Sequence, residues 1–224
     1  MKELKVSAII PAAGHGNRFG EAKQFKLLAG TPLFIHSIKA FLNSSKIHEI
    51  VVVVPKHKKD SIHKAIMSIS GDKKITVTTG GERRQDSVKN GVLVSDTTSD
   101  LICIHDAARP FITETLIDDS INSCESFDGA VIAIPSVDTI KYSENNIIMK
   151  TIDRNSIWLA QTPQVFWKDK LLKAYDSMDE SIVITDEASI MEKMGYKICL
   201  VPGDIKNNKI TTFEDWKYAE SRLK

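Results

Sequence analysis

The chain has 224 residues, and its 30 Lys and Arg residues nearly balance its 29 Asp and Glu residues, for a formal net charge of +1. This length favours one α/β domain with a full core, and the balanced charge argues against nucleic acid or an anionic membrane surface as a partner. The three cysteines include no C-x-x-C pair, and no apolar segment approaches transmembrane length. We therefore expect a cytoplasmic protein with no membrane partner, in which any anion binding is local.

The first predicted element is an apolar strand at residues 6–10, and a glycine-rich loop follows it at residues 11–25. Glycines let the backbone approach a ligand closely and expose its N–H groups. Arg18 and Lys23 lie in the same loop and would supply positive charge for an anion such as a polyphosphate. An ordinary strand-to-helix loop with solvated basic residues is the alternative interpretation.

Two familiar phosphate-binding loops do not match this segment. The dinucleotide fingerprint G-x-G-x-x-G needs a third glycine where Phe19 stands, and the next strand ends without a carboxylate for a ribose. The P-loop needs glycine before its lysine and Ser or Thr after it, whereas Lys23 lies between Ala22 and Gln24. What remains is a long loop that could wrap a nucleotide and grip its phosphates with Arg18 and Lys23.

Strand-like and helix-like segments then alternate along the chain. A helix is predicted to begin at Thr31-Pro32, with the proline in its first position, and another at Thr113 as the N-cap. The strands are short and apolar, which is typical of parallel strands covered on both faces. After the first helix, the predicted order is a strand at 50–54, a helix at 60–69, a strand at 75–79, a helix at 85–94, a strand at 101–104, a helix at 113–123 and a strand at 130–134.

The alternation breaks at residues 135–164, which show no helical period. Two strand-like runs, 138–142 and 147–152, flank the turn-rich tetrad Ser143-Glu144-Asn145-Asn146. We therefore predict a β-hairpin arm at about residues 136–160. Its apolar side chains need a surface to cover them, and we favour a second copy of the chain, hence a homodimer; an arm folded back on its own domain is the alternative.

Regular elements return after the arm. Helices are predicted at 168–178 and 186–194, the second capped by Thr185 and ended by Gly195, followed by a strand at 196–201 and a helix at 212–223. Alternation of this kind predicts right-handed βαβ units. The expected fold is α/β and Rossmann-like, with a mostly parallel twisted sheet, helices on both faces and the protruding arm. We expect residues 1–224 to form a single domain.

Chemically rich segments follow the predicted strands. In open parallel sheets, ligands bind beyond the carboxyl ends of the strands, so segments at these positions should meet at one edge. Five such segments are rich in glycine, charge or hydroxyl groups: 11–25, 80–87, 105–110, 135–139 and 204–211. Asp106 directly follows a buried strand, where a carboxylate can hold Mg²⁺ together with water and phosphates, or can simply cap a turn. The convergence favours an active site over solvated loops.

The motifs in these segments carry a family resemblance. The first loop resembles the signature A-A/G-G-x-G-x-R…P-K of nucleotidyltransferases that join a nucleoside triphosphate to a sugar phosphate, with Ala22 in place of the usual proline. The other motifs, in chain order, are Gly80-Gly81-Glu82-Arg83, His105-Asp106-Ala107-Ala108-Arg109-Pro110, Asp153-Arg154-Asn155, Gln161-Thr162-Pro163-Gln164 and Thr185-Asp186-Glu187-Ala188. Over almost the whole chain, they resemble the 2-C-methyl-D-erythritol 4-phosphate cytidylyltransferases of the non-mevalonate isoprenoid pathway.

The resemblance implies an activity. A cytidylyl group would pass from CTP to 2-C-methyl-D-erythritol 4-phosphate, releasing pyrophosphate, with Mg²⁺ or another divalent cation as cofactor. Ribitol-5-phosphate cytidylyltransferase is one alternative, although that family typically has Ala-Gly-Gly in the first loop, valine at the position of Ala108 and no Asp-Arg-Asn in the arm. A non-catalytic nucleotide-binding or regulatory domain is the other.

The resemblance also implies residue roles. Arg18, Lys23 and Lys209 would be catalytic, since they would bind the triphosphate and stabilise the charge of the transition state. Arg154 would reach from one subunit's arm into the partner's site, and Asp106 would also lie near the metal. Glu82 and Lys206 stand where relatives often have Asp, so no metal ligand is expected from the second of these positions. The implied nucleotide-binding residues are Pro11, Ala12, Ala13, Gly14, Gly16, Gly81, Glu82, Ser87 and Ala107, and the implied acceptor-binding residues are Asp106, Arg109, Thr139, Arg154 and Thr162.

The implied nucleophile is a phosphate monoester. Its second pKa is near ~6, so it is mostly dianionic at neutral pH and needs no general base. We therefore predict structural roles for His15 and His105. The catalytic task is to hold two anions together and to neutralise their charge, by positioning and electrostatic stabilisation.

Overall fold

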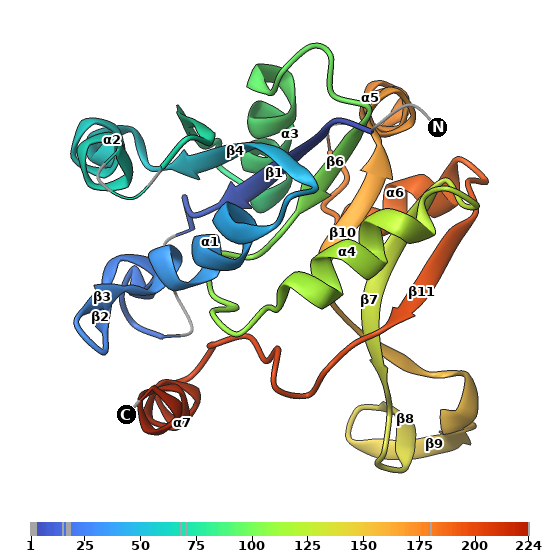
Figure 1. Cartoon of the computed structure of the whole chain (residues 1–224). Coiled ribbons are helices and arrows are strands. Elements are labelled where there is room, and N and C mark those ends of the chain that lie inside the picture. Colours follow the sequence, from blue (N-terminus) through green and yellow to red (C-terminus); the bar gives the residue numbers. More distant parts are fainter. Residues whose placement is uncertain are drawn as a thin grey trace.

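A seven-stranded sheet forms the centre of the computed structural model, which describes residues 4–14, 16, 19–67, 69, 71–179 and 181–223. The strands of this sheet are β1 (Val6–Pro11), β4 (Ile47–Val54), β5 (Lys74–Thr79), β6 (Leu101–Ile104), β7 (Gly129–Pro135), β10 (Trp158–Trp167) and β11 (Ile198–Pro202). They lie in the order β11-β7-β10-β6-β1-β4-β5 (Figure 1). All neighbours are parallel except β10, which is antiparallel to both β6 and β7, so the prediction of a mostly parallel sheet is confirmed.

Helices cover both faces of this sheet, as predicted. Their bounds are α1 (Leu33–Asn43), α2 (Lys59–Met67), α3 (Arg84–Val94), α4 (Glu114–Ser123), α5 (Lys168–Ser177), α6 (Ala188–Lys193) and α7 (Phe213–Arg222). Helices α1, α2 and α4 share one core cluster with the strands, and α3, α5 and α6 share the other (Figure 1). Helix α7 packs beside the short ribbon of β2 (Leu27–Leu28) and β3 (Thr31–Pro32). No helix in the described ranges has the length and apolar character needed to cross a membrane.

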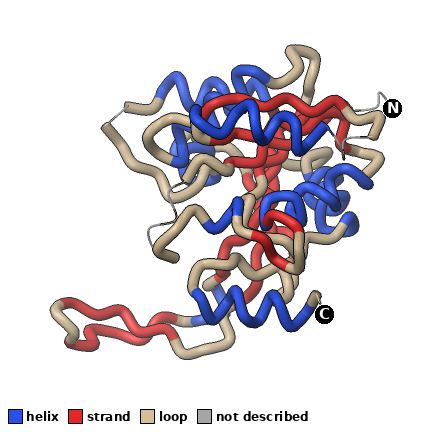
Figure 2. The backbone as a smooth tube through the Cα atoms, turned by 90° about the vertical axis from the view of Figure 1, so that its left-hand side faces the viewer, coloured by secondary structure: helices blue, strands red, loops and turns tan. Residues whose placement is uncertain are grey.

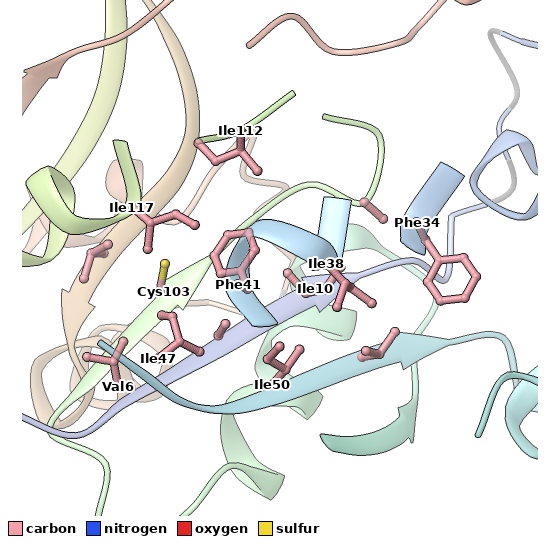
Figure 3. Close-up of a cluster of buried hydrophobic side chains, with 14 of the residues drawn as sticks. Val6, Ile10, Phe34, Ile38, Phe41, Ile47, Ile50, Cys103, Ile112 and Ile117 are labelled. Carbon is pink, nitrogen blue, oxygen red and sulfur yellow. The ribbon is translucent and has the colours of Figure 1, made fainter. Parts of the chain in front are cut away.

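Strands β1, β4 and β6 are mostly apolar because both of their faces are buried. Successive side chains of a strand point to opposite faces. Val6, Ala8 and Ile10 of β1 therefore join the cluster under α1 and α4, whereas Ile9 joins the cluster under α3 and α5. Figure 3 shows the first cluster, in which Phe41 of α1 lies over the strands. Because such strands form short runs of apolar residues, they could be predicted from the sequence.

Strand β10 is not predicted by the sequence pattern. Its middle carries the buried polar residues Gln161, Thr162 and Gln164, which interrupt the apolar run. Its register with β7 also shifts between Ala160 and Gln164. A polar, irregular strand in the interior is stable here because its side chains find hydrogen-bond partners, and no short-range pattern reveals those partners.

The starts of two helices differ from the predicted capping. Helix α1 begins at Leu33, so Pro32 precedes the first helical turn instead of occupying it. Helix α6 begins at Ala188 after Glu187, so the prediction of Thr185 as its N-cap is wrong. The N-cap role of Thr113 is confirmed, because its hydroxyl oxygen accepts a hydrogen bond from the Leu116 N–H at 3.4 Å.

The hairpin arm is formed by β8 (Ile140–Glu144) and β9 (Ile147–Ile152), which pair antiparallel. Asn145 and Asn146 form its turn with φ values of 49° and 65°, a conformation that asparagine tolerates better than most residues. The arm extends away from the sheet and helices (Figure 2), and the apolar side chains Tyr142, Ile147, Ile148 and Met149 are exposed. In the described residues, the arm therefore does not fold back on its own domain.

Candidate active site

A pocket opens at the carboxyl ends of the parallel strands. Segments that follow β1, β5, β6 and β11 meet there, so four of the five predicted segments converge, whereas residues 135–139 lead into the arm. All the residues implied above as nucleotide-binding, from Pro11 to Ala107, line this pocket, together with Lys23, Asp106 and Lys209. The full lining is Pro11, Ala12, Ala13, Gly14, Gly16, Lys23, Gln24, Gly81, Glu82, Arg83, Arg84, Ser87, Asp106, Ala107, Ala108 and Lys209.

Arg18 and His15 lie outside the described residues, so the roles expected for them stay predictions. The glycine between them is described. Gly16 has φ +73°, and a Cβ atom there would lie 1.8 Å from the carbonyl oxygen of Glu21. Only glycine fits this turn of the loop, which agrees with the close-packed phosphate-type loop predicted from the sequence.

The other wall of the pocket is built by close contacts between two loops. A Cβ atom on Gly80 would lie 2.3 Å from the Cβ of Ala13, so glycine is needed where the two loops meet. Ser87 lies at the start of α3 but does not cap it: its hydroxyl oxygen accepts a hydrogen bond from the Gly81 N–H at 3.1 Å. Asp86 takes that capping role by accepting a hydrogen bond from the Arg83 N–H at 3.0 Å. Ser87 therefore shapes the loop that carries Gly81 and Glu82.

Asp106 lies at the centre of a cluster of cations. Lys209 Nζ is 2.8 Å from its Oδ2, Arg109 Nε is 3.6 Å from the same oxygen, and Arg84 Nε is 3.4 Å from its Oδ1. Burial alone would raise the pKa of Asp106, but Lys209, Arg84 and Arg109 outweigh it and hold this pKa well below its usual range. The aspartate is therefore ionised, and it orients three positive side chains at the floor of the pocket.

A second, fully buried carboxylate stands behind Arg84. Glu187 receives hydrogen bonds from Arg84 Nη1 at 2.8 and 3.0 Å and from the Tyr175 hydroxyl at 3.3 Å. Burial raises the pKa of Glu187, and Arg84 offsets part of that rise. Arg84 thus bridges two carboxylates, Glu187 in the core and Asp106 in the pocket, and its guanidinium group is fixed between them.

His105 ties the aspartate loop to β10. Its Nε2 lies 3.0 Å from the carbonyl oxygen of Arg109, so Nε2 carries the proton and Nδ1 accepts from the Thr162 hydroxyl, also at 3.0 Å. The Thr162 oxygen in turn accepts from the Asp106 N–H at 3.0 Å. Burial lowers the pKa of His105 to about 4, so the ring is neutral at pH 7. This geometry agrees with the structural role predicted for His105.

A second pocket adjoins the first. Its lining includes Arg109 and Thr162, which were expected to bind the acceptor, and Thr185, which lines this pocket instead of capping a helix. Arg84, Asp106 and Lys209 line both pockets, so they form the junction between them. The complete lining is Arg84, Asp106, Arg109, Ala160, Gln161, Thr162, Gln164, Thr185, Asp186 and Lys209. Two anionic ligands in these pockets would meet at this positively charged junction.

Thr139 and Arg154 are not brought to either pocket of their own chain. Both are exposed near the arm, and Arg154 Nη1 donates a hydrogen bond to the carbonyl oxygen of Val137 at 2.7 Å. Gln24 and Arg84, by contrast, line the first pocket although the sequence did not single them out. Their neighbours in sequence, Lys23 and Arg83, lie in the predicted motifs, and that adjacency is the one signal that could have indicated them.

The donor set at the junction is poor in ligands for a divalent cation. Among the described residues, no three His, Cys, Asp or Glu side chains group so as to hold a metal ion. Asp106 is the carboxylate at the junction, and three cations already balance its charge. Such a site fits an ion that is held mainly by phosphate oxygens and water, and it does not fit one held by a cage of protein carboxylates.

Comparisons with known proteins agree on one family. A family model described as "IspD: 2-C-methyl-D-erythritol 4-phosphate cytidylyltransferase" matches residues 6–224. A protein of that name from Caldanaerobacter subterraneus subsp. tengcongensis is 38% identical, over 99% of this chain and 100% of its own. Another from Geobacter metallireducens is 37% identical, over 99% of this chain and 98% of its own.

Solved structures give the same result. The crystal structure of the 4-diphosphocytidyl-2C-methyl-D-erythritol synthase from Anaerococcus prevotii superposes with a TM-score of 0.88 at 29% identity, covering 99% of both chains. The Francisella tularensis 2-C-methyl-D-erythritol 4-phosphate cytidylyltransferase superposes with a TM-score of 0.79 at 32% identity, covering 98% of this chain and all of the other. The similarity therefore extends over nearly the whole chain.

Proposed function

The chain belongs to the IspD family of 2-C-methyl-D-erythritol 4-phosphate cytidylyltransferases, and from that premise we propose how its two pockets carry out the reaction. The enzyme transfers a cytidylyl group from CTP to 2-C-methyl-D-erythritol 4-phosphate and releases pyrophosphate, a step in isoprenoid precursor biosynthesis. One observation carries the proposed mechanism: the two pockets share Arg84, Asp106 and Lys209 as their junction. We place the reacting phosphates there.

CTP occupies the first pocket in this proposal. The close backbone approach at Gly80 and Gly81 suits a planar base, and Ser87 holds that loop in place. The exocyclic amine of cytosine needs an acceptor, which a carbonyl near Gly81 or the carboxylate of Glu82 would supply. The triphosphate extends along the first loop towards Lys23 and Lys209, and Arg18 completes this set of cations by the family resemblance.

The sugar phosphate occupies the second pocket. An oxygen of its phosphate attacks the α-phosphorus of CTP in line, a new P–O bond forms, and the bond to the bridging oxygen of pyrophosphate breaks as pyrophosphate leaves. No proton has to be removed, because the attacking phosphate is already mostly dianionic. Lys209, Arg109 and Arg84 neutralise the charge that accumulates when the two anions meet, and Thr162 keeps the Asp106 loop in place.

We also propose a divalent cation at the junction, held by few protein ligands. The junction offers Asp106 as one oxygen ligand, so the remaining ligands would be phosphate oxygens and water. When bound, the ion would screen the charge of the triphosphate. The residues described above would bind and orient both substrates around it.

We propose that the enzyme is a single nucleotidyltransferase domain that works as a cytoplasmic homodimer. The exposed apolar residues Tyr142, Ile147, Ile148 and Met149 support dimerisation through the arm, because isolated β-hairpins seldom expose such a group without a partner. Thr139 and Arg154 would then serve the partner's acceptor pocket. The free thiols of Cys103, Cys124 and Cys199 support a reducing compartment. Sedimentation of a monomer at micromolar concentration would overturn the dimer.

The experiment that tests the function is pyrophosphate release from CTP with a panel of acceptors. We expect turnover with 2-C-methyl-D-erythritol 4-phosphate and little with ribitol 5-phosphate, and we expect CTP to be preferred over ATP, GTP and UTP. Preference for ribitol 5-phosphate would favour the related enzyme instead. Binding of CTP without pyrophosphate release from any acceptor would favour a non-catalytic nucleotide-binding domain.

A further inference from the structure

The side chain of Gln24 holds the glycine-rich loop in place by hydrogen bonds. Gln24 lies in a short 3-10 helix, Lys23–Phe25, and is 6% exposed. Its Nε2 donates hydrogen bonds to the carbonyl oxygens of Ala12, at 2.9 Å, and of Gly14, at 2.6 Å. Because both partners can only accept, the amide nitrogen has to face them, and this requirement fixes the orientation of the amide group.

These two bonds set the direction of a backbone donor in the pocket. In a trans peptide, the C=O of one residue and the N–H of the next point in opposite directions. Holding the Ala12 carbonyl towards Gln24 therefore turns the Ala13 N–H away from Gln24. Ala13 lines the pocket, and its N–H has no hydrogen bond to any described residue, which leaves this donor available to a ligand. On the other side, the Ala12 N–H is held by the Val53 carbonyl oxygen at 2.7 Å.

Gln24 also sets the distance between the backbone of residues 12–14 and the positive charge of Lys23. Lys23 directly precedes it in the same short helix, and both residues line the pocket. A side chain that binds residues 12–14 therefore fixes Lys23 relative to them. The backbone donors and Lys23 would contact the same triphosphate. Holding them in place beforehand strengthens binding, because ordering them only when the ligand binds would cost affinity.

We propose that Gln24 is a positioning residue for CTP, which holds the backbone of residues 12–14 and Lys23 in the arrangement that binds the nucleotide. The inference rests on the proposed placement of CTP in this pocket. Gln24 acts through the loop and Lys23, so its loss should weaken the binding of CTP and leave the binding of the acceptor nearly unchanged. The acceptor pocket has no Gln24 in its lining.

The test compares Gln24→Met with Lys73→Met. Methionine keeps the length and volume of Gln24 but removes both donors, so we expect the KM for CTP to rise about tenfold, in line with two lost hydrogen bonds, while the KM for the acceptor stays within about twofold. Lys73 is the matched control: its Nζ also holds two backbone carbonyl oxygens, those of Ser44 and Ile47, both at 2.6 Å. It lies at the opposite end of β5 from the pocket, so its loss should lower the melting temperature and leave both KM values unchanged.

The outcomes separate this inference from the proposed function. A wild-type enzyme with no turnover of CTP would contradict the function itself. An active wild type, with a folded Gln24→Met variant whose KM for CTP is unchanged or whose two KM values rise equally, would overturn the role of Gln24. If Gln24→Met does not fold, Gln24→Glu provides the second test, since a carboxylate of the same shape opposes the two carbonyls at neutral pH. A CTP-specific rise in KM is again expected, and its absence overturns the proposal.

Discussion

At the scale of single residues, Lys23 is the clearest case of a charge whose role can be separated from its packing. It is only 9% exposed, its Nζ lies 5.6 Å from the centre of the Phe19 ring, and it lines the first pocket, where we propose that CTP binds. Lys23→Met keeps most of the buried stem and removes the charge. We expect turnover to fall by at least about 100-fold, because electrostatic stabilisation of the transition state is lost, with little change in melting temperature.

Lys26→Met is the control for this experiment. Lys26 is in the same segment and pairs with Glu21 at 2.5 Å, but it does not line the pocket. Steady-state kinetics measures the turnover of both variants, and thermal unfolding measures their melting temperatures. Near-normal turnover of Lys23→Met would remove Lys23 from the catalytic set.

Arg84 both stabilises the fold and lines the two pockets, and a double-mutant cycle can separate these roles. Its removal leaves Glu187, which is 0% exposed, without its ion partner, and breaking a buried pair in this way typically costs about 3 to 5 kcal/mol of unfolding free energy. We expect Arg84→Met to show such a loss in urea denaturation. The double variant Arg84→Met with Glu187→Gln should regain most of it, because no uncompensated carboxylate remains in the core.

Turnover should behave differently from stability in the same cycle. Arg84 lines both pockets, so the double variant should be stable and still slow. Recovery of turnover together with stability would mean that Arg84 only supports the fold. Glu187→Gln alone measures how much the buried carboxylate contributes to holding Arg84 in place.

The site residues that the sequence did not reveal are those that act through other residues. Lys23 and Lys209 can be found because a motif predicts a charge at a strand end. Gln24 stands beside Lys23 and Glu187 lies in the motif Thr185-Asp186-Glu187-Ala188, but neither position reveals its partners. Gln24 binds the backbone of Ala12 and Gly14, and Glu187 binds Arg84, 103 positions earlier in the chain. Their roles follow from contacts that only the folded chain creates.

At the scale of elements, a buried glutamate at the far end of the strands predicts how acid affects stability. Glu49 of β4 accepts hydrogen bonds from Ser7 of β1 at 3.0 Å and from the Asp96 N–H at 2.7 Å, and it pairs with Lys74 of β5 at 2.8 Å. Burial would raise the pKa of Glu49, but Lys74, the Asp96 N–H and Ser7 together lower it below its ordinary value of 4.5. One carboxylate thus connects three strands.

The direction of the pH effect follows from that lowered pKa. Because the folded state binds this proton less readily than the unfolded state, Glu49 stabilises the fold above pH 4.5, and that stability is lost as the pH falls through the folded-state pKa. We expect the unfolding free energy of wild type to exceed that of Glu49→Gln at pH 7, with the gap closing in acid. The exposed residue Glu192, changed to Gln, is the control. A gap that stays constant down to pH 3 would contradict this linkage.

The elements that could be predicted from sequence are those whose pattern is local. The parallel strands β1, β4 and β6 are apolar on both faces, and the capping residue of α4 is adjacent to its helix, so both are visible in short windows. The arm could be predicted from its turn and two strand-like runs. Strand β10 could not, because Gln161, Thr162 and Gln164 are buried by long-range contacts with residues 204, 105 and 186 respectively.

At the scale of the whole molecule, one chain contains a nearly complete site and an arm that serves none of its own pockets. Lys23, Asp106, Arg109 and Lys209 line the two pockets within the chain, whereas Arg154 is exposed and directly follows the arm strand β9 in sequence. The arm itself extends away from the sheet and helices (Figure 2). If Arg154 holds the acceptor phosphate, it has to act on a second copy. The homodimer and the reach of Arg154 into the partner therefore form one hypothesis, and a single experiment can test both parts.

Complementation between two inactive variants is that experiment. Arg154→Met should damage only the site of the partner, and Lys23→Met only the site of its own subunit. A mixed dimer then has one site with both residues intact and one with neither. Random pairing makes about half of the dimers mixed, so co-expression should restore about a quarter of wild-type turnover.

The control for complementation pairs two residues of the same pocket. Lys23 and Lys209 both line the first pocket within one chain, so co-expressed Lys23→Met and Lys209→Met subunits leave every site with one lesion. That mixture should stay inactive, although it forms the same dimers. If the Arg154 and Lys23 mixture is equally inactive, the arm does not act across the dimer, and Arg154 either serves its own subunit or has no part in binding the acceptor. Partial activity in the first mixture alone requires the acceptor site to be built from two chains.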